Sequence, residues 1–275
     1  MSGYRDNLVS FPDVALIEGD VRDEQAVAEA ANGVEAIFHL AASVGNTRSI
    51  EHPIDDAEIN VIGTLRVLEA ARHQGVRKVV ISSSAGIFGE LKTLPIREDH
   101  PIEPISPYGA TKLAEEKLGL VYGQLYSVEV IALRYFNVYG VNQRYDAYGN
   151  VIPIFAHRIL NGQPITIFGD GEQTRDFVNV RDVAQANYLA AMSEGVQGAF
   201  NLGSASSISI NALAAGMYDI TGHEPNIVYG PPRPGDVRDS LADIAAATRA
   251  VGYCPSVDIH EGLTEYLAWA EKAKV

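Results

Sequence analysis

Short apolar runs alternate with helical stretches through the first half of the chain, and this alternation constrains the fold more than any other feature. The apolar runs that predict strands are 14–18, 36–40, 78–82 and 128–134, and the helical stretches are 24–31, 57–73 and 108–123. Strands that alternate with helices form βαβ units, in which neighbouring strands run parallel and helices cover the sheet. The predicted fold class is therefore α/β, with a doubly wound parallel sheet.

The chain changes character after about residue 140, where prolines and glycines divide it into short pieces. A strand at 199–202 is expected to return to the main sheet, and a last helix is expected at 258–272. We therefore expect two lobes. The first comprises 1–140 and about 176–205, and a smaller α+β lobe comprises about 141–175 and 206–275.

Composition excludes several classes of protein. The formal net charge of −14 disfavours nucleic acid as a partner, because nucleic-acid binders concentrate Lys and Arg. No apolar run approaches the roughly 18 residues of a membrane span, and the N-terminus has no apolar signal core. Cys254 is the single cysteine, so we expect no internal disulfide, and it is interpreted as a small core residue. We expect a cytoplasmic protein without a metal site, since the seven histidines lack ligand spacing.

Tyr108 and Lys112 stand four residues apart, which places them on one face of a helix. A free tyrosine has a pKa of about 10, and a nearby ammonium lowers that pKa. The pair can therefore make a tyrosine act as a general base or acid. The spacing by itself also fits a tyrosine packed on the core beside a solvated lysine, so the two interpretations stay open here.

Polar side chains follow two of the predicted strands. The strand at 78–82 ends in the serine run 82–84, and the strand at 128–134 is followed by Asn137. Ligands of doubly wound sheets bind outside the carboxyl ends of the strands. The serines are thus candidates to hold a substrate hydroxyl, although serines in a turn also satisfy backbone groups. His39, at another strand end, is interpreted as a buried structural residue.

Taken together, six motifs resemble a known family. They are GDVRD at 19–23, HLAA at 39–42, NVIGT at 60–64, SSS at 82–84, YGATK at 108–112 and RYFN at 134–137. Their identity and order resemble the extended short-chain dehydrogenase/reductase family. Within it, they are similar to NAD-dependent sugar-nucleotide epimerases of the UDP-glucose or UDP-N-acetylglucosamine 4-epimerase type. The resemblance implies a Rossmann-like sheet lobe, NAD as cofactor and a nucleotide-sugar substrate.

The resemblance also implies a role for individual residues. The catalytic residues are Ser84, Tyr108 and Lys112. The cofactor-binding residues are Asp20, Val21, Leu40, Ala41, Ala42, Asn60, Ser82, Tyr108, Lys112 and Tyr135. The substrate-binding residues are Ser84, Asn137, Asn150, Val151, Thr166, Ile167, Phe168, Arg175, Arg233, Asp236 and Ser240. Of these, Asn137, Arg175 and Arg233 are expected to hold the diphosphate, and Asp236 the ribose of the nucleotide.

Two positions discriminate within the family. Sugar-nucleotide dehydratases carry an Asp-Glu pair just after the catalytic serine or threonine, whereas this chain has Ala85 and Gly86 there. Ser240 occupies a position that is a bulky tyrosine in strict UDP-glucose epimerases, so the resemblance implies space for an N-acetyl group. We therefore predict C4 inversion of a UDP-hexose or UDP-N-acetylhexosamine through a 4-keto sugar. A sugar-nucleotide dehydratase or decarboxylase is an alternative.

Family members begin with a strand, a Gly-x-x-Gly-x-x-Gly turn and a helix, and this sequence contains no such glycine spacing. Roughly 35–40 residues are expected to be missing, about the size of a βαβ unit. We therefore expect an N-terminally incomplete Rossmann-like domain that binds NAD weakly. The chain is then a shortened epimerase, a natural fragment, or a non-catalytic remnant that binds a sugar nucleotide. The resemblance also implies a homodimer through the helices at 57–73 and 108–123.

Overall fold

The computed structural model describes residues 4–145, 149–232 and 237–273. The helices are η1 (Arg5–Leu8), α1 (Glu24–Ala30), α2 (Asn46–Glu51), α3 (Pro53–Ala57), η2 (Glu58–Ile62), α4 (Gly63–Gln74), η3 (Ala85–Ile87), α5 (Pro107–Leu125), α6 (Val151–Leu160), α7 (Val180–Met192), α8 (Ile210–Thr221), α9 (Ala245–Val251) and α10 (Ile259–Ala273). The strands are β1 (Ala36–His39), β2 (Lys78–Ser84), β3 (Glu129–Tyr135), β4 (Asn137–Tyr139), β5 (Ile165–Phe168), β6 (Thr174–Arg175), β7 (Phe177–Asn179), β8 (Gly198–Leu202), β9 (Ile208–Ser209) and β10 (Ile227–Gly230).

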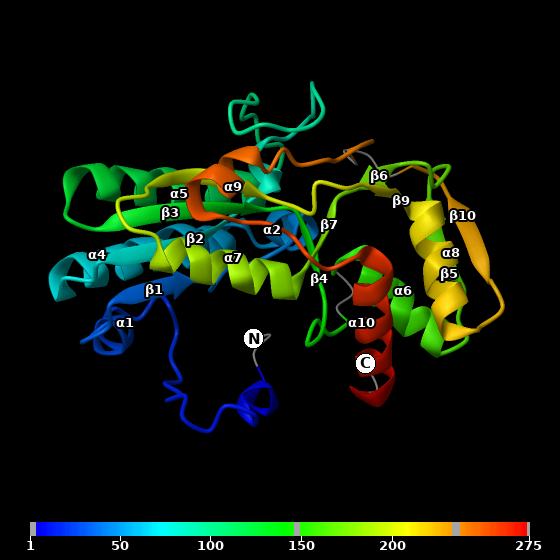
Figure 1. The fold of residues 1–275 in the computed structure, drawn as a ribbon, viewed down its shortest axis with the longest axis horizontal. Coiled ribbons are helices and arrows are strands. Elements are labelled where there is room, and N and C mark those ends of the chain that lie inside the picture. The colour runs from blue at the N-terminus through cyan, green and yellow to red at the C-terminus, as the bar shows by residue number, and fades with distance from the viewer. Residues whose placement is uncertain (1–3, 146–148, 233–236, 274–275) are drawn as a thin grey trace.

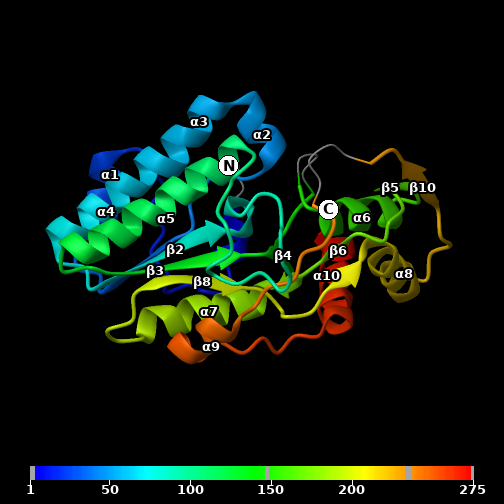
Figure 2. The same ribbon diagram turned by 90° about the horizontal axis from the view of Figure 1, so that it is seen from above.

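A four-stranded parallel sheet in the order β1-β2-β3-β8 forms the larger lobe. Figure 2 shows α4 and α5 on one face of this sheet and α7 and α9 on the other. Strands β2 and β3 are almost wholly buried, which explains why their sequences are continuous apolar runs rather than alternating ones. The register places Ser84 beside Tyr135 at the carboxyl ends of the two strands. The predicted α/β fold with a parallel sheet is confirmed.

Helix α4 shows how sequence pattern leads to packing in this lobe. Its buried face includes Val67, Leu68 and Ala71, which recur at helical spacing and pack with β2 in one apolar cluster. Gly75 adopts a left-handed conformation with φ of 70° and ends the helix. The helix start differs from the prediction, because α3 continues through the π-helical turn η2 into α4. This turn carries Asn60.

The smaller lobe lies at the right of Figure 1 and is built around α6, α8 and α10. Its core is a cluster that includes Phe155, Ile167, Met217 and Tyr266. Two short sheets flank the helices, with β5 parallel to β10 and β6 antiparallel to β9. The parallel pair β4 and β7 lies between this lobe and the large sheet, directly after Tyr135 on β3.

Two sequence-based interpretations are wrong. Residues 14–18 form no strand, and Val14, Leu16 and Ile17 are each at least half exposed. A strand needs a neighbour to pair its backbone groups, and no described strand lies beside this segment. Cys254 is exposed rather than a core residue.

The division into lobes differs from expectation in one respect. Helix α9 and Tyr253 pack in the apolar cluster of the large sheet, although the sequence placed them in the smaller lobe. Otherwise the predicted lobe boundaries stay a prediction. None of the helices in the described ranges combines the length and the apolarity that crossing a bilayer requires.

We predict that Leu68→Ala lowers the free energy of unfolding by about 2–5 kcal/mol, because it leaves a cavity between α4 and the sheet. Leu68 is 0% exposed, whereas Leu125 on α5 is 66% exposed and provides the matched control. Leu125→Ala is expected to change the free energy of unfolding by less than about 0.5 kcal/mol. Urea unfolding followed by circular dichroism measures both, and equal effects would contradict this packing.

Candidate active site

The first turn of α5 positions Tyr108. Ser106 caps the helix by accepting a hydrogen bond from the Gly109 amide at 3.1 Å. The Tyr108 amide donates to the hydroxyl of the buried Ser49 at 3.0 Å, which ties this turn to α2. These two hydrogen bonds hold the backbone of the turn and therefore fix the position from which the Tyr108 side chain extends into the site.

Ser84 and Gly86 form the wall against which Tyr108 packs. The Ser84 hydroxyl accepts from the Gly86 amide at 3.1 Å and is hydrogen bonded to the Tyr108 side chain. A Cβ atom added to Gly86 would lie 3.3 Å from the Ser84 Oγ and 3.6 Å from the Tyr108 ring. A Cβ atom on Gly109 would lie only 2.5 Å from the Gly86 carbonyl oxygen. Glycine at both positions therefore allows the serine and the tyrosine to meet.

The electrostatics of Tyr108 depend on its burial. Burial raises the pKa of Tyr108 to about 12, the Ser84 hydrogen bond opposes this rise, and the negative charges of Glu115 and Asp56 add to it. Lys112, 2% exposed, donates to a carboxylate oxygen of Glu115. The structure thus places Ser84 beside Tyr108, with Lys112 one helical turn further along α5. The partner of the lysine is the Glu115 carboxylate, which the sequence motif does not include.

Hydrogen bonds from η2 and β2 hold the predicted cofactor residues that follow β1. Asn60 accepts from the Ser43 amide at 2.7 Å and donates to the Ser43 carbonyl at 3.1 Å, while the Ser82 hydroxyl donates to the His39 carbonyl at 3.1 Å. These bonds fix both ends of the segment 40–42. Leu40, 54% exposed, and Ala41 are open to solvent, and Ala42 is partly buried. An exposed path along 40–42 therefore leads from β1 toward Asn60.

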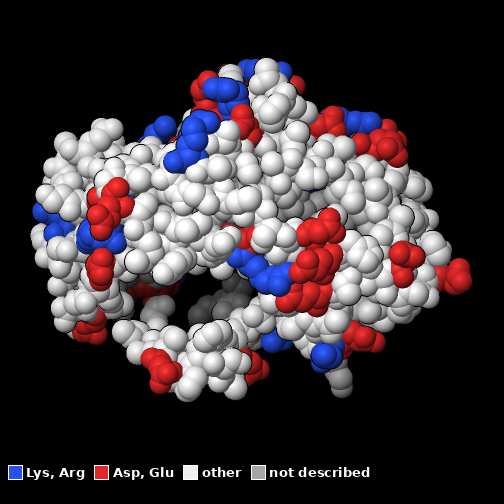
Figure 3. Space-filling model, viewed as in Figure 1, with Lys and Arg blue, Asp and Glu red and all other residues white. Residues whose placement is uncertain are grey.

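In the described part of the chain, β1 pairs only with β2, so its other edge has no neighbouring strand. Figure 3 shows the molecule hollowed below this lobe, between its body and the N-terminal segment that is dark blue in Figure 1.

Tyr135 is partly buried, and its hydroxyl donates to the Asn187 amide oxygen at 2.9 Å.

Asp20 and Val21 lie near the start of α4. A Cβ atom added to Gly63 would be 2.7 Å from a methyl carbon of Val21, so the Val21 side chain packs directly on the backbone of Gly63. Asp20 pairs with Arg22 at 2.7 Å, and these hydrogen bonds hold the pKa of Asp20 at about 2. Arg22 also reaches Glu58 at 3.1 Å. The exposed Asp20 carboxylate is therefore already engaged by a cation.

Asn137 and Arg175, two of the predicted diphosphate residues, lie close together on either side of Asp176, which directly precedes β7. Asn137 on β4 donates its side-chain amide to the Asp176 carbonyl at 3.0 Å. Arg175 immediately precedes Asp176, and its guanidinium donates to the Thr174 carbonyl at 2.8 Å. The Asp176 carboxylate accepts from the Ser204 amide and hydroxyl, each at 2.7 Å, and this anchors the segment. Arg233 and Asp236 lie outside the described residues.

The other predicted substrate residues belong to the smaller lobe. Asn150 precedes α6 and donates to the Val138 carbonyl at 3.5 Å, and Val151 is the first residue of that helix. On β5, Thr166 and Phe168 share one face, while the side chain of Ile167 is 1% exposed and belongs to the core. The prediction that Ile167 frames the base is therefore wrong for its side chain. Ser240 is 8% exposed.

A buried ion pair beside the site was not predicted. The Arg134 guanidinium donates to both carboxylate oxygens of Glu116, at 2.9 and 2.8 Å, and the Ser83 hydroxyl donates to the same carboxylate at 2.8 Å. Burial alone would raise the pKa of Glu116, but these hydrogen bonds and the Arg134 charge together lower it. The pair ties α5 to the ends of β2 and β3. Its sequence signal is that Glu116 follows Lys112 by four residues, on the same helical face.

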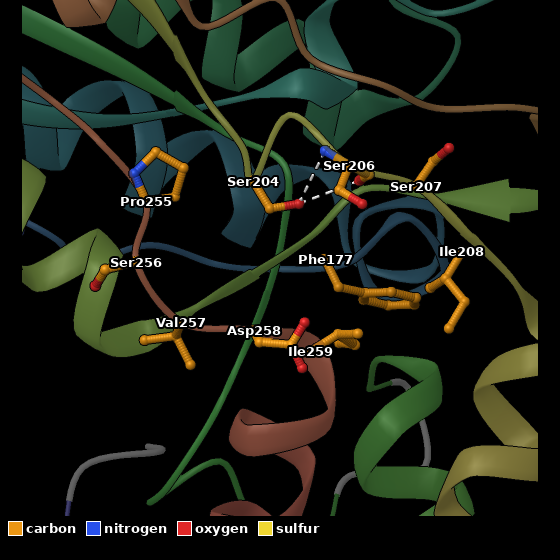
Figure 4. A pocket seen from close by; sticks show the side chains of 10 residues that line it. All are labelled: Phe177, Ser204, Ser206, Ser207, Ile208, Pro255, Ser256, Val257, Asp258 and Ile259. Carbon is orange, nitrogen blue, oxygen red and sulfur yellow. Dashed lines mark hydrogen bonds between the residues drawn. The ribbon is translucent and has the colours of Figure 1, made fainter.

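A separate pocket shares no residue with the Ser84–Tyr108 contact. Its lining comprises Phe177, Ser204, Ser206, Ser207, Ile208, Pro255, Ser256, Val257, Asp258 and Ile259. Figure 4 shows the hydrogen bonds of Ser204 to Ser206, and the Ser256 hydroxyl donates to Asp182 at 3.0 Å. The hydroxyls of Ser204 and Ser256 thus serve the local structure. Among the described residues, no group of three or more His, Cys, Asp or Glu is arranged to hold a metal ion.

The sheet, the Tyr108–Lys112 helix and the Ser84 turn together define a nucleotide-dependent α/β enzyme class. The chain belongs to the NAD-dependent epimerase/dehydratase family, whose model matches residues 2–203. It is 38% identical over 275 residues to the putative UDP-glucose 4-epimerase of Methanocaldococcus jannaschii, covering 98% of this chain and 87% of that protein. It is 39% identical over 232 residues to the UDP-glucose 4-epimerase of Mycolicibacterium smegmatis, covering 84% and 74%.

Solved structures show the same likeness. The UDP-glucose 4-epimerase of Thermotoga maritima, with UDP-glucose, has a TM-score of 0.94 and 37% identity, covering 100% of this chain and 89% of that chain. The UDP-N-acetylglucosamine 4-epimerase of Methanobrevibacter ruminantium, with UDP-N-acetylmuramic acid, has a TM-score of 0.94 and 33% identity, covering 99% and 88%. The predicted family is confirmed.

We predict that Arg134→Met lowers the free energy of unfolding by about 3–5 kcal/mol at neutral pH, because Glu116 is left buried without its cation. The lowered pKa of Glu116 contributes stability above its unfolded pKa of about 4.3, and this contribution is lost as pH falls. The difference between Arg134→Met and the parent should therefore shrink in acid. Urea unfolding at several pH values measures it.

The control is Arg97→Met, which removes an exposed ion pair with Asp99. This variant should show no resolvable change. A loss for Arg134→Met that stays constant from neutral to acidic pH would argue against an ionised Glu116 as the cause.

Proposed function

We propose that this chain is an NAD-dependent epimerase that inverts C4 of a UDP-hexose or UDP-N-acetylhexosamine. The observation that carries the proposal is the contact between Tyr108 and Ser84 at the carboxyl end of β2, beside the buried Lys112. Relatives and solved neighbours named UDP-glucose and UDP-N-acetylglucosamine 4-epimerases support it. So does the family's dependence on NAD.

The residues around Tyr108 fit the nicotinamide ribose of NAD. The ammonium of Lys112 and the hydroxyl of Tyr108 supply donors for ribose hydroxyls, and the exposed segment 40–42 runs beside them, braced by Asn60. Leu40, Ala41 and Ala42 would then line the dinucleotide path, Asp20 and Val21 would hold the adenine, and Ser82 and Tyr135 would complete the cofactor site. When bound, NAD would supply the hydride acceptor and donor for C4 of the sugar.

Tyr108 and Ser84 perform the proton transfer. Ser84 would hold the sugar 4-hydroxyl, and Tyr108 as phenolate would take its proton as C4 is oxidised. The Tyr108 hydroxyl would return the proton when the 4-keto sugar is reduced on its other face. Because burial raises the pKa of Tyr108 to about 12, the phenolate needs the positive charge of Lys112 nearby.

The dehydratase alternative is disfavoured by the turn after Ser84. Elimination of water needs an additional acid and base, and Gly86 lies where a side chain would press on Tyr108 and Ser84. The other alternative is a non-catalytic protein that binds sugar nucleotides. Such a protein would bind the UDP-sugar but would show no turnover when NAD is supplied.

The substrate is proposed to lie between the lobes. Asn137, Arg175 and Arg233 hold the diphosphate, Asp236 the ribose, and Asn150, Val151, Thr166, Phe168 and the backbone of Ile167 the base. Ser240, being small, leaves room for an N-acetyl group. We also propose a cytoplasmic homodimer, for which the exposed apolar Ile62 on η2 and Val121 on α5 offer a contact surface.

We predict that Tyr108→Phe lowers kcat for 4-epimerisation by about 10²–10⁴-fold, because the general base is lost. Binding of the UDP-sugar should persist, since the ring and its packing remain. Nuclear magnetic resonance follows interconversion of the C4 epimers with NAD added, and calorimetry follows binding. Full turnover by the variant, or no turnover by the parent chain with saturating NAD, would contradict the proposed function.

Ser240→Tyr is predicted to lower kcat/KM for UDP-N-acetylglucosamine about tenfold or more relative to UDP-glucose, because the larger side chain fills the space of the N-acetyl group. Thr166→Ser, a small change elsewhere in the smaller lobe, is the control and should leave that ratio unchanged. An equal loss for both sugars in Ser240→Tyr would show that position 240 does not select the substrate.

A further inference from the structure

Glu115 is a buried carboxylate that the proposed mechanism does not use. Its side chain is 0% exposed, and it lies three residues after Lys112 on the same face of α5. One carboxylate oxygen accepts from the Lys112 ammonium, whereas the other is buried without a hydrogen-bond partner among the described residues. An ionised carboxylate with one bare oxygen is costly to bury, so its presence beside the proposed base calls for a role.

The groups that face Glu115 come from several elements. They are Lys112, Tyr108 and Glu116 on α5, His39 on β1 and Tyr135 on β3. Asp56 on α3 acts on Tyr108 rather than on Glu115, and Arg134 on β3 pairs with Glu116. Arg134 neutralises Glu116. His39 lies 3.9 Å from Glu115, but burial, followed by the Lys112 charge, lowers the pKa of His39 to about 3, so it is neutral. Lys112 contacts Glu115 and stands one helical turn after Tyr108 on α5, so it is a cation that both groups can share.

Two anions compete for this cation. Burial raises the pKa of Glu115 to about 7, against the effect of Lys112. When Glu115 is ionised, its charge raises the pKa of Tyr108. When Glu115 is neutral, the lysine charge is uncompensated and favours the Tyr108 phenolate.

We infer that Glu115 is a positioning residue that shares the Lys112 ammonium with Tyr108 and thereby restrains formation of the Tyr108 phenolate. The inference rests on the proposed function only for the catalytic use of Tyr108. The charge competition itself is a property of the free protein.

Titration of Tyr108 in the free protein tests this competition. Because the chain has 13 tyrosines, each protein is compared with the same protein that also carries Tyr108→Phe. The difference in near-ultraviolet tyrosinate absorbance between the two, measured as a function of pH, reports Tyr108 alone. In Glu115→Gln the Tyr108 titration should move to lower pH by about one unit, because the lysine charge is no longer shared. Glu115→Asp keeps a carboxylate and should restore part of the parent titration.

A second lysine–glutamate pair supplies the matched control. Glu129 lies 2.8 Å from the fully buried Lys78, at the opposite end of the same strands. Glu129→Gln should leave the titration of Tyr108 unchanged. An unchanged titration in Glu115→Gln, or an equal shift in Glu129→Gln, would overturn the inference.

A further comparison decides the question if Glu115→Gln does not fold. Lys112→Met and the double variant Lys112→Met/Glu115→Gln differ only in the carboxylate, and the double variant removes both charges of the buried pair. Tyr108 should titrate at lower pH in the double variant, because the Glu115 charge itself raises the pKa of Tyr108. Equal titrations would show that Glu115 does not restrain the phenolate and would overturn the inference.

Where the parent is active, the acidic limb of its kcat/KM profile should move to lower pH in Glu115→Gln. A parent with no 4-epimerase activity refutes the proposed function but leaves the titration result intact.

Discussion

Helix α5 buries Lys112, Glu115 and Glu116 against the sheet, together with most of Tyr108, and the rest of the site depends on how these ionisable groups are paired. Uncompensated charge in such an interior costs several kcal/mol, so each charged group must find a partner. Glu116 meets Arg134 and the Ser83 hydroxyl, and this fixes the helix to the ends of β2 and β3. Lys112 meets Glu115. The geometry around Tyr108 is thereby rigid, while its charge environment can change with the protonation of Glu115.

This arrangement links the fold to the chemistry. Parallel strands bring Ser84 and Tyr135 to the same edge, and the glycines at 86 and 109 let α5 approach that edge. Strands β4 and β7 pair between the smaller lobe and the site. Strand β4 begins with Asn137, and β7 begins two residues after Arg175. A sugar held between the lobes would meet the serine and the tyrosine together.

Most of the large sheet could be predicted from sequence, because strands buried on both faces are apolar runs whatever their neighbours. The run at 14–18 has the same composition and forms no strand, since pairing requires a neighbouring strand that local sequence cannot supply. Similarly, the apolar Ile167 was expected to face a ligand, and only the packing of β5 shows that it faces the core. The prediction that Cys254 lies in the core was wrong in the opposite sense, because its exposure depends on the path of the chain after Tyr253.

The site could be predicted only as far as its motifs extend. Ser84, Tyr108 and Lys112 are recognisable from residue type and spacing, but their partners are chosen in three dimensions. The pairing of Arg134 with Glu116 joins a strand to a helix, and His39 approaches Glu115 from a third element. The adjacent acids at 115 and 116, on the face of Tyr108 and Lys112, were the one local signal, and a charge pair at that spacing is more often solvated.

The central claim is that C4 is inverted by removal and return of the same hydride, with Tyr108 moving the proton. A UDP-hexose that carries deuterium at C4, incubated with this chain and NAD in ordinary water, tests that claim most directly. Nuclear magnetic resonance should show the inverted product with its deuterium retained at C4. Inversion with loss of the deuterium to solvent would contradict the account, as would a product that has lost water.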